Sequence, residues 1–250
     1  TRGPLTDLLR AAAQTRARPD ATTYSSLLLA DARSISQRTG LPLREVEGAA
    51  LAADILPERY SRNQKSLSCA DQLRLLQSHV AIIGLGGLGG TVVEILSRLG
   101  IGELTLVDGD VFDESNLNRQ LLSSPARLGE KKVKAAEARV REINPAVKVT
   151  AVDEFFTAAN GPSILAGAQL AVDCLDTIPA RFVLQQACRT AKIPMVSAAI
   201  AGTGGQATTI FPSDTGLQQI YGSPDKAPQK GIEAALGTLP FTAVYMAAVE

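Results

Sequence analysis

The chain has 250 residues, 45% of them hydrophobic, which is enough to bury the core of one large domain with a smaller module attached. Lys and Arg together number 25, as do Asp and Glu, so no net charge draws the chain to nucleic acid or to an anionic membrane surface. Because no apolar stretch is long enough to span a bilayer and no basic-then-apolar leader occurs, we expect a cytoplasmic protein with neither nucleic acid nor a membrane as partner.

Residues 1–57 are predicted to form a small, separate helical module. Apolar residues recur with helical spacing in Leu5–Ala13, Tyr24–Ile35 and Val46–Ile55, and Pro and Gly residues separate these segments. Ser34–Ile55 is faintly similar to a helix-turn-helix, but the module carries seven Arg against six acidic residues, a balance that argues against DNA binding. A docking or dimer-stabilising role is the simpler expectation.

Residues 58–250 show short apolar runs that alternate with helical segments. Apolar strands separated by helices are typical of a parallel sheet that is covered on both faces. We therefore predict the α/β class, with a doubly wound, mostly parallel, Rossmann-like sheet. The predicted strands are His79–Leu85, Glu103–Asp108, Val147–Val152, Leu170–Cys174 and Pro194–Ala199, and the predicted helices are Gly89–Leu99, Glu130–Ile143 and Ile178–Ala191. Gly205–Phe211 is a candidate for an added strand, and residues 212–236 are predicted to form a long loop.

A glycine-rich turn directly follows the first predicted strand. Gly84, Gly86, Gly87 and Gly89 let the backbone turn tightly and let phosphates approach the N-terminus of the next helix, whose free N–H groups favour anions. Asp108 closes the second strand nineteen residues after Gly89, where a carboxylate can accept the two ribose hydroxyls. Together these residues predict an adenine nucleotide, without choosing between NAD and ATP.

The residues that follow Asp108 favour ATP. Asp110, Asn116 and Gln120 accompany two cations, Arg119 and Lys132, which are thirteen residues apart. Hydride transfer needs no such cluster beyond the ribose, whereas a triphosphate needs cations that hold it and neutralise charge on the departing pyrophosphate.

Asp176 comes just after the fourth predicted strand, at the carboxyl edge of the sheet where doubly wound folds bind ligands. A carboxylate at this place suits Mg²⁺ that is bound together with phosphate oxygens. Simpler interpretations exist, since Asp176 could cap the next helix, Arg119 could form a surface ion pair and Lys132 could be an exposed helical lysine. The order and placement of all three favour a single ligand.

Seven ordered motifs resemble those of the ThiF/MoeB/HesA family, relatives of the ubiquitin-activating enzymes. The resemblance covers about residues 58–250 and is far more specific than the glycine-rich turn alone. The motifs are Arg59–Gln64, Gly84–Gly90, Leu106–Asp110, Ser115–Gln120, Gly129–Val133, Ile143–Pro145 and Asp173–Asp176.

This resemblance implies a role for each site residue. Asp108 would bind ribose, Arg119 and Lys132 would hold the phosphates, and Asp176 would bind Mg²⁺. Arg62 matches an arginine that reaches the γ-phosphate from the other subunit of a homodimer. The C-terminal Gly-Gly carboxylate of a ubiquitin-like sulfur-carrier protein would attack the α-phosphorus of ATP and displace pyrophosphate. Three further residues would line the same site: Asp110, Asn116 and Gln120.

The sequence departs from the family pattern at two places. Many members carry paired CxxC zinc motifs, but Gln218–Gly222 stands where the first would begin and no cysteine follows Cys188, so we expect no zinc. Members with a thiol intermediate have a cysteine shortly before a Glu-Ala segment, whereas here Gly231 precedes Glu233. The three cysteines of the chain, Cys69, Cys174 and Cys188, are far apart in sequence, and we expect each to be a small buried apolar residue. We therefore expect the acyl-adenylate to be the product.

Three other functions fit the sequence less well. Activation of a non-protein or RNA-borne carboxylate would call for a basic surface, of which the neutral balance gives no sign. For an NAD oxidoreductase, the chain offers no evident catalytic acid or base, since the single histidine, His79, begins a predicted strand. A catalytically silent scaffold would not need the complete set of charged residues described above.

Overall fold

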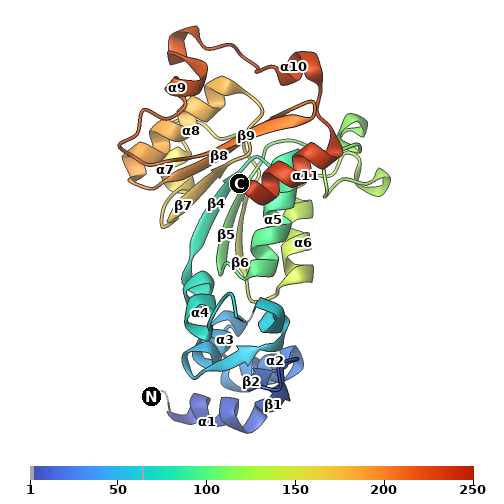
Figure 1. Cartoon of the computed structure of the whole chain (residues 1–250), viewed down its shortest axis with the longest axis vertical. Helices are drawn as coiled ribbons and strands as arrows, with labels where there is room; N and C mark the ends of the chain where they lie inside the picture. The colour runs from blue at the N-terminus through green and yellow to red at the C-terminus, as the bar shows by residue number, and fades with distance from the viewer. Residues whose placement is uncertain (1–2, 64) are drawn as a thin grey trace.

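A computed structural model describes residues 3–63 and 65–250, so Gln64 of the first motif lies outside the described residues. Figure 1 shows an N-terminal module at one end of an elongated molecule and a larger sheet domain at the other. The module contains helices α1 (Gly3–Ala12), α2 (Leu29–Thr39) and α3 (Leu43–Ala52). Its three-stranded sheet has the order β1-β2-β3, with strands Gln14–Ala17, Thr23–Leu27 and Ile55–Pro57.

The module thus contains the predicted helices, but also a sheet that its apolar periodicity did not predict. The apolar run Tyr24–Ile35 divides at Leu28 into strand β2 and helix α2. Strand β2 forms an antiparallel hairpin with β1 and a parallel pair with β3, which together bury Leu27 in the core of the module. The hairpin turn contains Asp20, whose carboxylate accepts hydrogen bonds from the backbone N–H and the hydroxyl of Thr22. Thr23–Leu27 is thus a strand because of its pairing with β1 and β3, which the local apolar pattern does not reveal.

The larger domain has a six-stranded sheet in the order β6-β5-β4-β7-β8-β9. The first five strands of this domain, β4 to β8, run parallel to one another. The added strand expected at Gly205–Phe211 is β9, which forms an antiparallel edge. These observations confirm the α/β class and the mostly parallel sheet. The strands are β4 (His79–Ile83), β5 (Glu103–Val107), β6 (Lys148–Val152), β7 (Leu170–Asp173), β8 (Met195–Ala201) and β9 (Gly204–Ile210).

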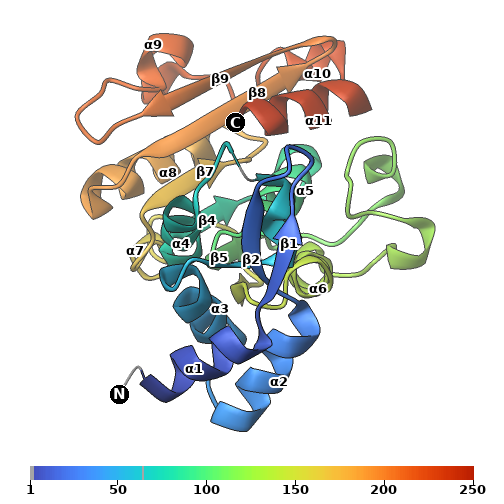
Figure 2. The ribbon, with the colours of Figure 1, turned by 60° about the horizontal axis from the view of Figure 1, so that its bottom comes forward.

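Helices cover both faces of this sheet (Figure 2). Apolar side chains of α5 (Gly87–Leu99), α6 (Lys132–Ile143) and α11 (Pro240–Val249) share one core with the sheet, and α7 (Gly161–Ile164) and α8 (Ile178–Ala191) share the other. The remaining helical elements are η1 (Glu58–Asn63), α4 (Cys69–Gln77), η2 (Glu114–Asn116), η3 (Pro125–Arg127), α9 (Gln218–Tyr221), η4 (Pro224–Lys226) and α10 (Glu233–Leu236). None of the helices in the described part of the chain is both long and apolar enough to cross a membrane.

The strand order places a ligand crevice beside β4. The chain passes from β4 to β5 on one side and later to β7 on the other, so the connections diverge at the carboxyl end of β4. Doubly wound folds bind ligands at such a divergence. The glycine-rich turn lies at this point.

Candidate active site

A cavity of about 370 Å³ lies at the carboxyl ends of the central strands. Its walls come from the loops after β4, β5 and β7 and from the segment between β9 and α11. Nine of the site residues predicted from the sequence line it: Gly84, Gly86, Gly87, Asp108, Asp110, Arg119, Gln120, Lys132 and Asp176.

The glycine-rich turn forms the floor of this cavity. Gly84 has a φ of +94°, and a Cβ atom there would lie 2.6 Å from the carbonyl oxygen of Cys174, so the turn passes directly against the end of β7. Helix α5 then begins at Gly87 without a side-chain cap, which leaves its first N–H groups available to an anion. Gly89 lies outside the cavity lining. A Cβ atom at Gly89 would lie 1.9 Å from the carbonyl oxygen of Gly84, so its role here is close packing of the helix on the turn.

The Asp108 carboxylate is fixed by the backbone. Its Oδ2 accepts a hydrogen bond of 2.7 Å from the N–H of Leu85, and its Oδ1 accepts one of 2.8 Å from the N–H of Asp110. Each carboxylate oxygen has a further lone pair. The geometry suits a ligand with two neighbouring hydroxyls, such as a ribose.

Lys132 is held inside the cavity wall. Its side chain is 8% exposed, and Nζ donates a 3.1 Å hydrogen bond to Oδ2 of Asp110. Gln120 is buried nearby, and its Oε1 has no hydrogen-bond partner among the described residues. A buried acceptor without a partner is costly, so this amide suits a ligand that carries a donor.

Arg119 lines the cavity, and Nη1 donates to the carbonyl of Ser115 at 3.0 Å and to Oδ1 of Asn118 at 2.8 Å. Asn116 is placed differently. It lies outside the cavity lining and completes the capping box of the short helix η2, in which Asp113 is the N-cap and Asn116 Oδ1 accepts a 3.1 Å hydrogen bond from the N–H of Asp113. Its contribution is therefore to the shape of the loop that carries Arg119.

Asp176 extends from the loop after β7, with a side chain that is 83% exposed. Within the described residues, no group of three His, Cys, Asp or Glu side chains could hold a metal ion alone. A single carboxylate nevertheless fits Mg²⁺, which commonly keeps water ligands and shares phosphate oxygens with its protein site.

The sequence did not point to two cations that also line the cavity, Lys230 and Arg181. Lys230 Nζ lies 3.3 Å from Oδ2 of Asp176. The Arg181 guanidinium donates to the carbonyls of Leu175 and Ala198 at 2.5 and 2.7 Å, so it supports the cavity wall. Arg181 lies on the buried face of α8, so the helical periodicity of that segment could have indicated that its side chain points inward. Lys230 lies outside the helices and strands, so no periodicity indicates where its side chain points.

Arg62 lies on η1, away from the cavity. Its neighbour Tyr60 accepts a 2.8 Å hydrogen bond from Asn144 and packs against Gly100, at the C-terminal end of α5. The cavity lies at the other end of this helix, whose 13 residues span about 20 Å. That span exceeds the reach of an arginine side chain, so Arg62 does not complete the cavity of its own chain.

The three cysteines are poor nucleophiles in this fold. Burial raises the pKa of Cys188 to about 12 and that of Cys174 well above the ordinary thiol value. Burial, with a contribution from Asp54, raises the pKa of Cys69 to about 12. Thiolate is the reactive form, so none of these residues is activated.

The chain matches the model of the ThiF family over residues 60–250. It is 36% identical over 198 residues to the SAMP-activating enzyme E1 of Haloferax volcanii, which covers 77% of this chain and 73% of that protein. It is 38% identical over 158 residues to the molybdopterin-synthase adenylyltransferase of Escherichia coli, which covers 62% of this chain and 64% of that protein.

Among solved structures, the E. coli tRNA N6-threonylcarbamoyladenosine dehydratase TcdA in complex with ATP has a TM-score of 0.59 and 25% identity. That match covers 76% of this chain and 92% of the other. The chain thus spans about three quarters of the haloarchaeal relative but less than two thirds of the bacterial adenylyltransferase. By sequence and by fold, the chain belongs to the ThiF family of ATP-binding adenylyltransferases.

Proposed function

We propose that this protein uses ATP to adenylate the C-terminal glycine carboxylate of a ubiquitin-like sulfur-carrier protein. The observation that carries the proposal is the meeting of Asp108, Arg119, Lys132 and Asp176 around one cavity at the N-terminus of α5. The names of two relatives, a SAMP-activating enzyme and a molybdopterin-synthase adenylyltransferase, support the carrier as the substrate.

The residues of the cavity have separate tasks in this reaction. Asp108 holds the ribose, while Arg119 and Lys132 bind the phosphates and neutralise charge that develops on the leaving pyrophosphate. Mg²⁺, which Asp176 would hold together with phosphate oxygens, would supply further charge neutralisation. The carrier carboxylate attacks the α-phosphorus, an acyl-adenylate forms and pyrophosphate leaves. Positioning of the two anions provides most of the catalysis.

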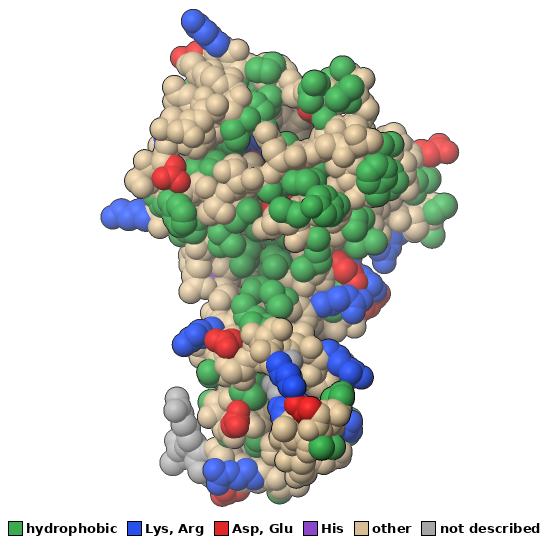
Figure 3. Space-filling view, in the orientation of Figure 1, with side chains coloured by type: hydrophobic (Ala, Val, Ile, Leu, Met, Phe, Trp, Pro, Cys, Tyr) green, Lys and Arg blue, Asp and Glu red, His purple; other side chains and the backbone are tan. Residues whose placement is uncertain are grey.

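The proposed active form is a homodimer in which Arg62 enters the partner's cavity. Support comes from the distance between η1 and the cavity of the same chain. Figure 3 shows apolar side chains gathered over α11, where Phe241, Val244 and Tyr245 are exposed. Exposed apolar patches of this kind mark interaction surfaces. We therefore expect two chains to share their active sites.

Carrier-dependent exchange of radiolabelled pyrophosphate into ATP tests the proposal. The wild-type protein should catalyse exchange only when a carrier with a C-terminal Gly-Gly is present, and Asp176→Ala should remove most of it. Asp225→Ala is the matched control, because Asp225 is exposed in η4 and does not line the cavity. Full exchange by Asp176→Ala, or binding of NAD without binding of ATP, would refute the assignment.

A second candidate is adenylation of a carboxylate carried by RNA or by a small molecule. The similarity to TcdA over 92% of that chain favours this alternative. Substitution of RNA or a small carboxylate for the carrier in the same exchange assay separates the two functions.

A further inference from the structure

The segment between β9 and α11 lines the cavity and is held in place by two hydrogen bonds, one on each side of its cavity-lining residues. On one side, the backbone N–H of Ile178 donates a 3.2 Å hydrogen bond to the carbonyl of Gln229. On the other side, Asn118 Nδ2 donates to the carbonyl of Thr238 at 3.2 Å. Lys230 and Glu233 lie between these contacts and line the cavity. The segment is therefore a wall of the site that comes from outside the βαβ core.

Lys230 is the cation that this wall brings to the site. Its Nζ is 3.3 Å from Oδ2 of Asp176, and the two side chains are 52% and 83% exposed. An ion pair with this exposure is weak, because water competes with each partner. Exchange of either partner for a stronger ligand is therefore easy.

Two other cations of the cavity are more firmly engaged. Arg181 is buried and donates to two backbone carbonyls. Lys132 is nearly buried against Asp110. Lys230 is thus more exposed and more weakly held than either of them, and its present partner is the carboxylate that the proposed function assigns to Mg²⁺.

We propose that Lys230 is a phosphate-binding residue that exchanges Asp176 for the triphosphate when nucleotide enters. The inference rests on the proposed function. An ammonium group and Mg²⁺ cannot both stay close to one carboxylate oxygen without repulsion. The triphosphate offers the displaced ammonium several anionic oxygens. Binding of MgATP therefore draws residues 222–238 onto the nucleotide.

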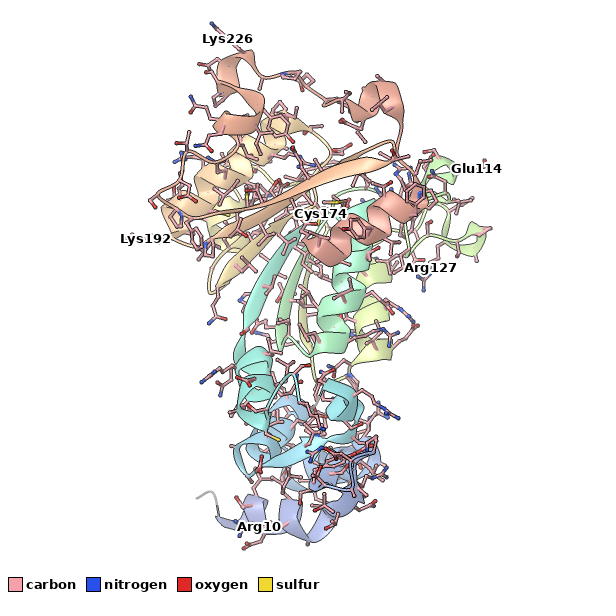
Figure 4. All side chains as sticks on the ribbon, viewed as in Figure 1. Arg10, Glu114, Arg127, Cys174, Lys192 and Lys226 are labelled. Atoms are coloured by element: carbon pink, nitrogen blue, oxygen red, sulfur yellow. The ribbon has the colours of Figure 1, made fainter. Side chains whose placement is uncertain are left out.

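Lys230→Met tests this role, since methionine keeps much of the length of the side chain and removes its charge. Lys226→Met is the matched control, because Lys226 belongs to the same segment but does not line the cavity. Figure 4 shows Lys226 at the outer tip of the segment, far from Cys174, which lines the cavity. A non-hydrolysable ATP analogue with Mg²⁺ is the probe.

Two measurements are made on the intact proteins. Calorimetric titration should show a dissociation constant about tenfold higher for Lys230→Met, the effect of one charged hydrogen bond, and no change for Lys226→Met. Limited trypsin digestion of the wild-type protein and of Lys230→Met reports on the segment through cleavage after Lys226, a site that Lys226→Met lacks. The nucleotide should slow this cleavage in the wild-type protein and not in Lys230→Met.

Unchanged affinity and unchanged protection in Lys230→Met would overturn the proposal. Tighter nucleotide binding by this variant would do so as well, because Lys230 would then only compete with Mg²⁺. The proposed function fails separately, if the wild-type protein binds the analogue but shows no carrier-dependent exchange. A wild-type protein that binds no ATP analogue would remove both proposals.

Discussion

Arg59 and Glu47 form an ion pair between η1 and the N-terminal module, with 2.7 Å between Nη1 and Oε2. Glu47 is fully buried. The same Arg59 nitrogen donates a 3.1 Å hydrogen bond to Oδ1 of Asn144, and Asn144 in turn donates to Tyr60 and to the carbonyl of Ser97. This network connects the module to the C-terminal end of α5 and fixes the helix that carries Arg62.

The first prediction concerns this ion pair. Glu47→Ala leaves the Arg59 guanidinium partly buried without its anion, so we expect it to lower the free energy of unfolding by about 3 kcal/mol. Urea denaturation measures the change. Glu45→Ala, on the exposed face of the same helix, should have little effect. Equal effects of the two substitutions on the free energy of unfolding would show that the ion pair between η1 and the module does not stabilise the fold.

The second prediction concerns the ion pair between α5 and α6. Arg139 donates to both carboxylate oxygens of Glu94, at 2.7 and 2.9 Å, and these hydrogen bonds lower the pKa of Glu94 below its ordinary value of 4.5. A carboxyl group with a lowered pKa stabilises the fold above its unfolded-state pKa, and this contribution disappears as the pH falls through the folded-state pKa. Glu94→Gln should therefore cost about 1 kcal/mol at neutral pH.

Denaturation curves at several pH values test this expectation. The difference between the wild-type protein and Glu94→Gln should shrink steadily below about pH 4. Glu142→Gln, which removes a more exposed partner of Arg139, should show a smaller difference at neutral pH. A difference that does not depend on pH would mean that Glu94 acts through packing.

The sheet domain was readily predicted from the sequence, because its signals are local. Helix α8 was predicted over the same residues that form it, with an amphipathic pattern and a proline in its first turn. The strand β2 was missed because Tyr24–Leu27 is too short to separate a period of two from one of 3.6, and because one of its two partners, β3, is distant in sequence.

Some residues of the candidate site could likewise be predicted from local signals, and others could not. The glycine-rich turn and Asp108 follow predicted strands, so their meeting at one sheet edge could be expected. Lys230 could not be found, because the segment that carries it is positioned by contacts such as that between Ile178 and Gln229. Asn116 was expected to line the cavity, yet its side chain instead accepts a hydrogen bond from the backbone N–H of Asp113, a local bond that asparagine commonly makes.

The third prediction is that activation proceeds without a thioester. Gly231, at the position where the resemblance to thioester-forming members would place a thiol, lines the cavity, and burial raises the pKa of each cysteine. A reaction with carrier and ATP should therefore leave no reducible enzyme–carrier adduct on a non-reducing gel. Gly231→Cys is a useful comparison, because its Cβ atom would meet only the flexible end of Glu233. A reducible adduct of the wild-type protein would contradict the prediction.

The last prediction concerns the origin of Arg62. Asn63 donates to Gln72, which donates to the carbonyl of Leu99, and Tyr60 accepts a hydrogen bond from Asn144. Residues on both sides of Arg62 are therefore tied to the C-terminal end of α5. The cavity lies at the opposite end of that helix. A guanidinium binds a terminal phosphate through two parallel hydrogen bonds and keeps its charge when water is excluded. If Arg62 acts on ATP, it must act in the partner's cavity.

Arg62→Ala and Asp176→Ala should each be nearly inactive alone and should regain activity when their subunits are mixed. In the mixed dimer, the cavity with an intact Asp176 receives an intact Arg62 from its partner, while the other cavity lacks both groups. About half of the normal exchange activity per mixed dimer is therefore expected if the two cavities are independent. Differently tagged subunits, purified in two steps, provide the mixed dimer for the assay. If purified mixed dimers stay inactive, Arg62 acts within its own chain, whereas full activity of Arg62→Ala alone would mean that it has no part in catalysis.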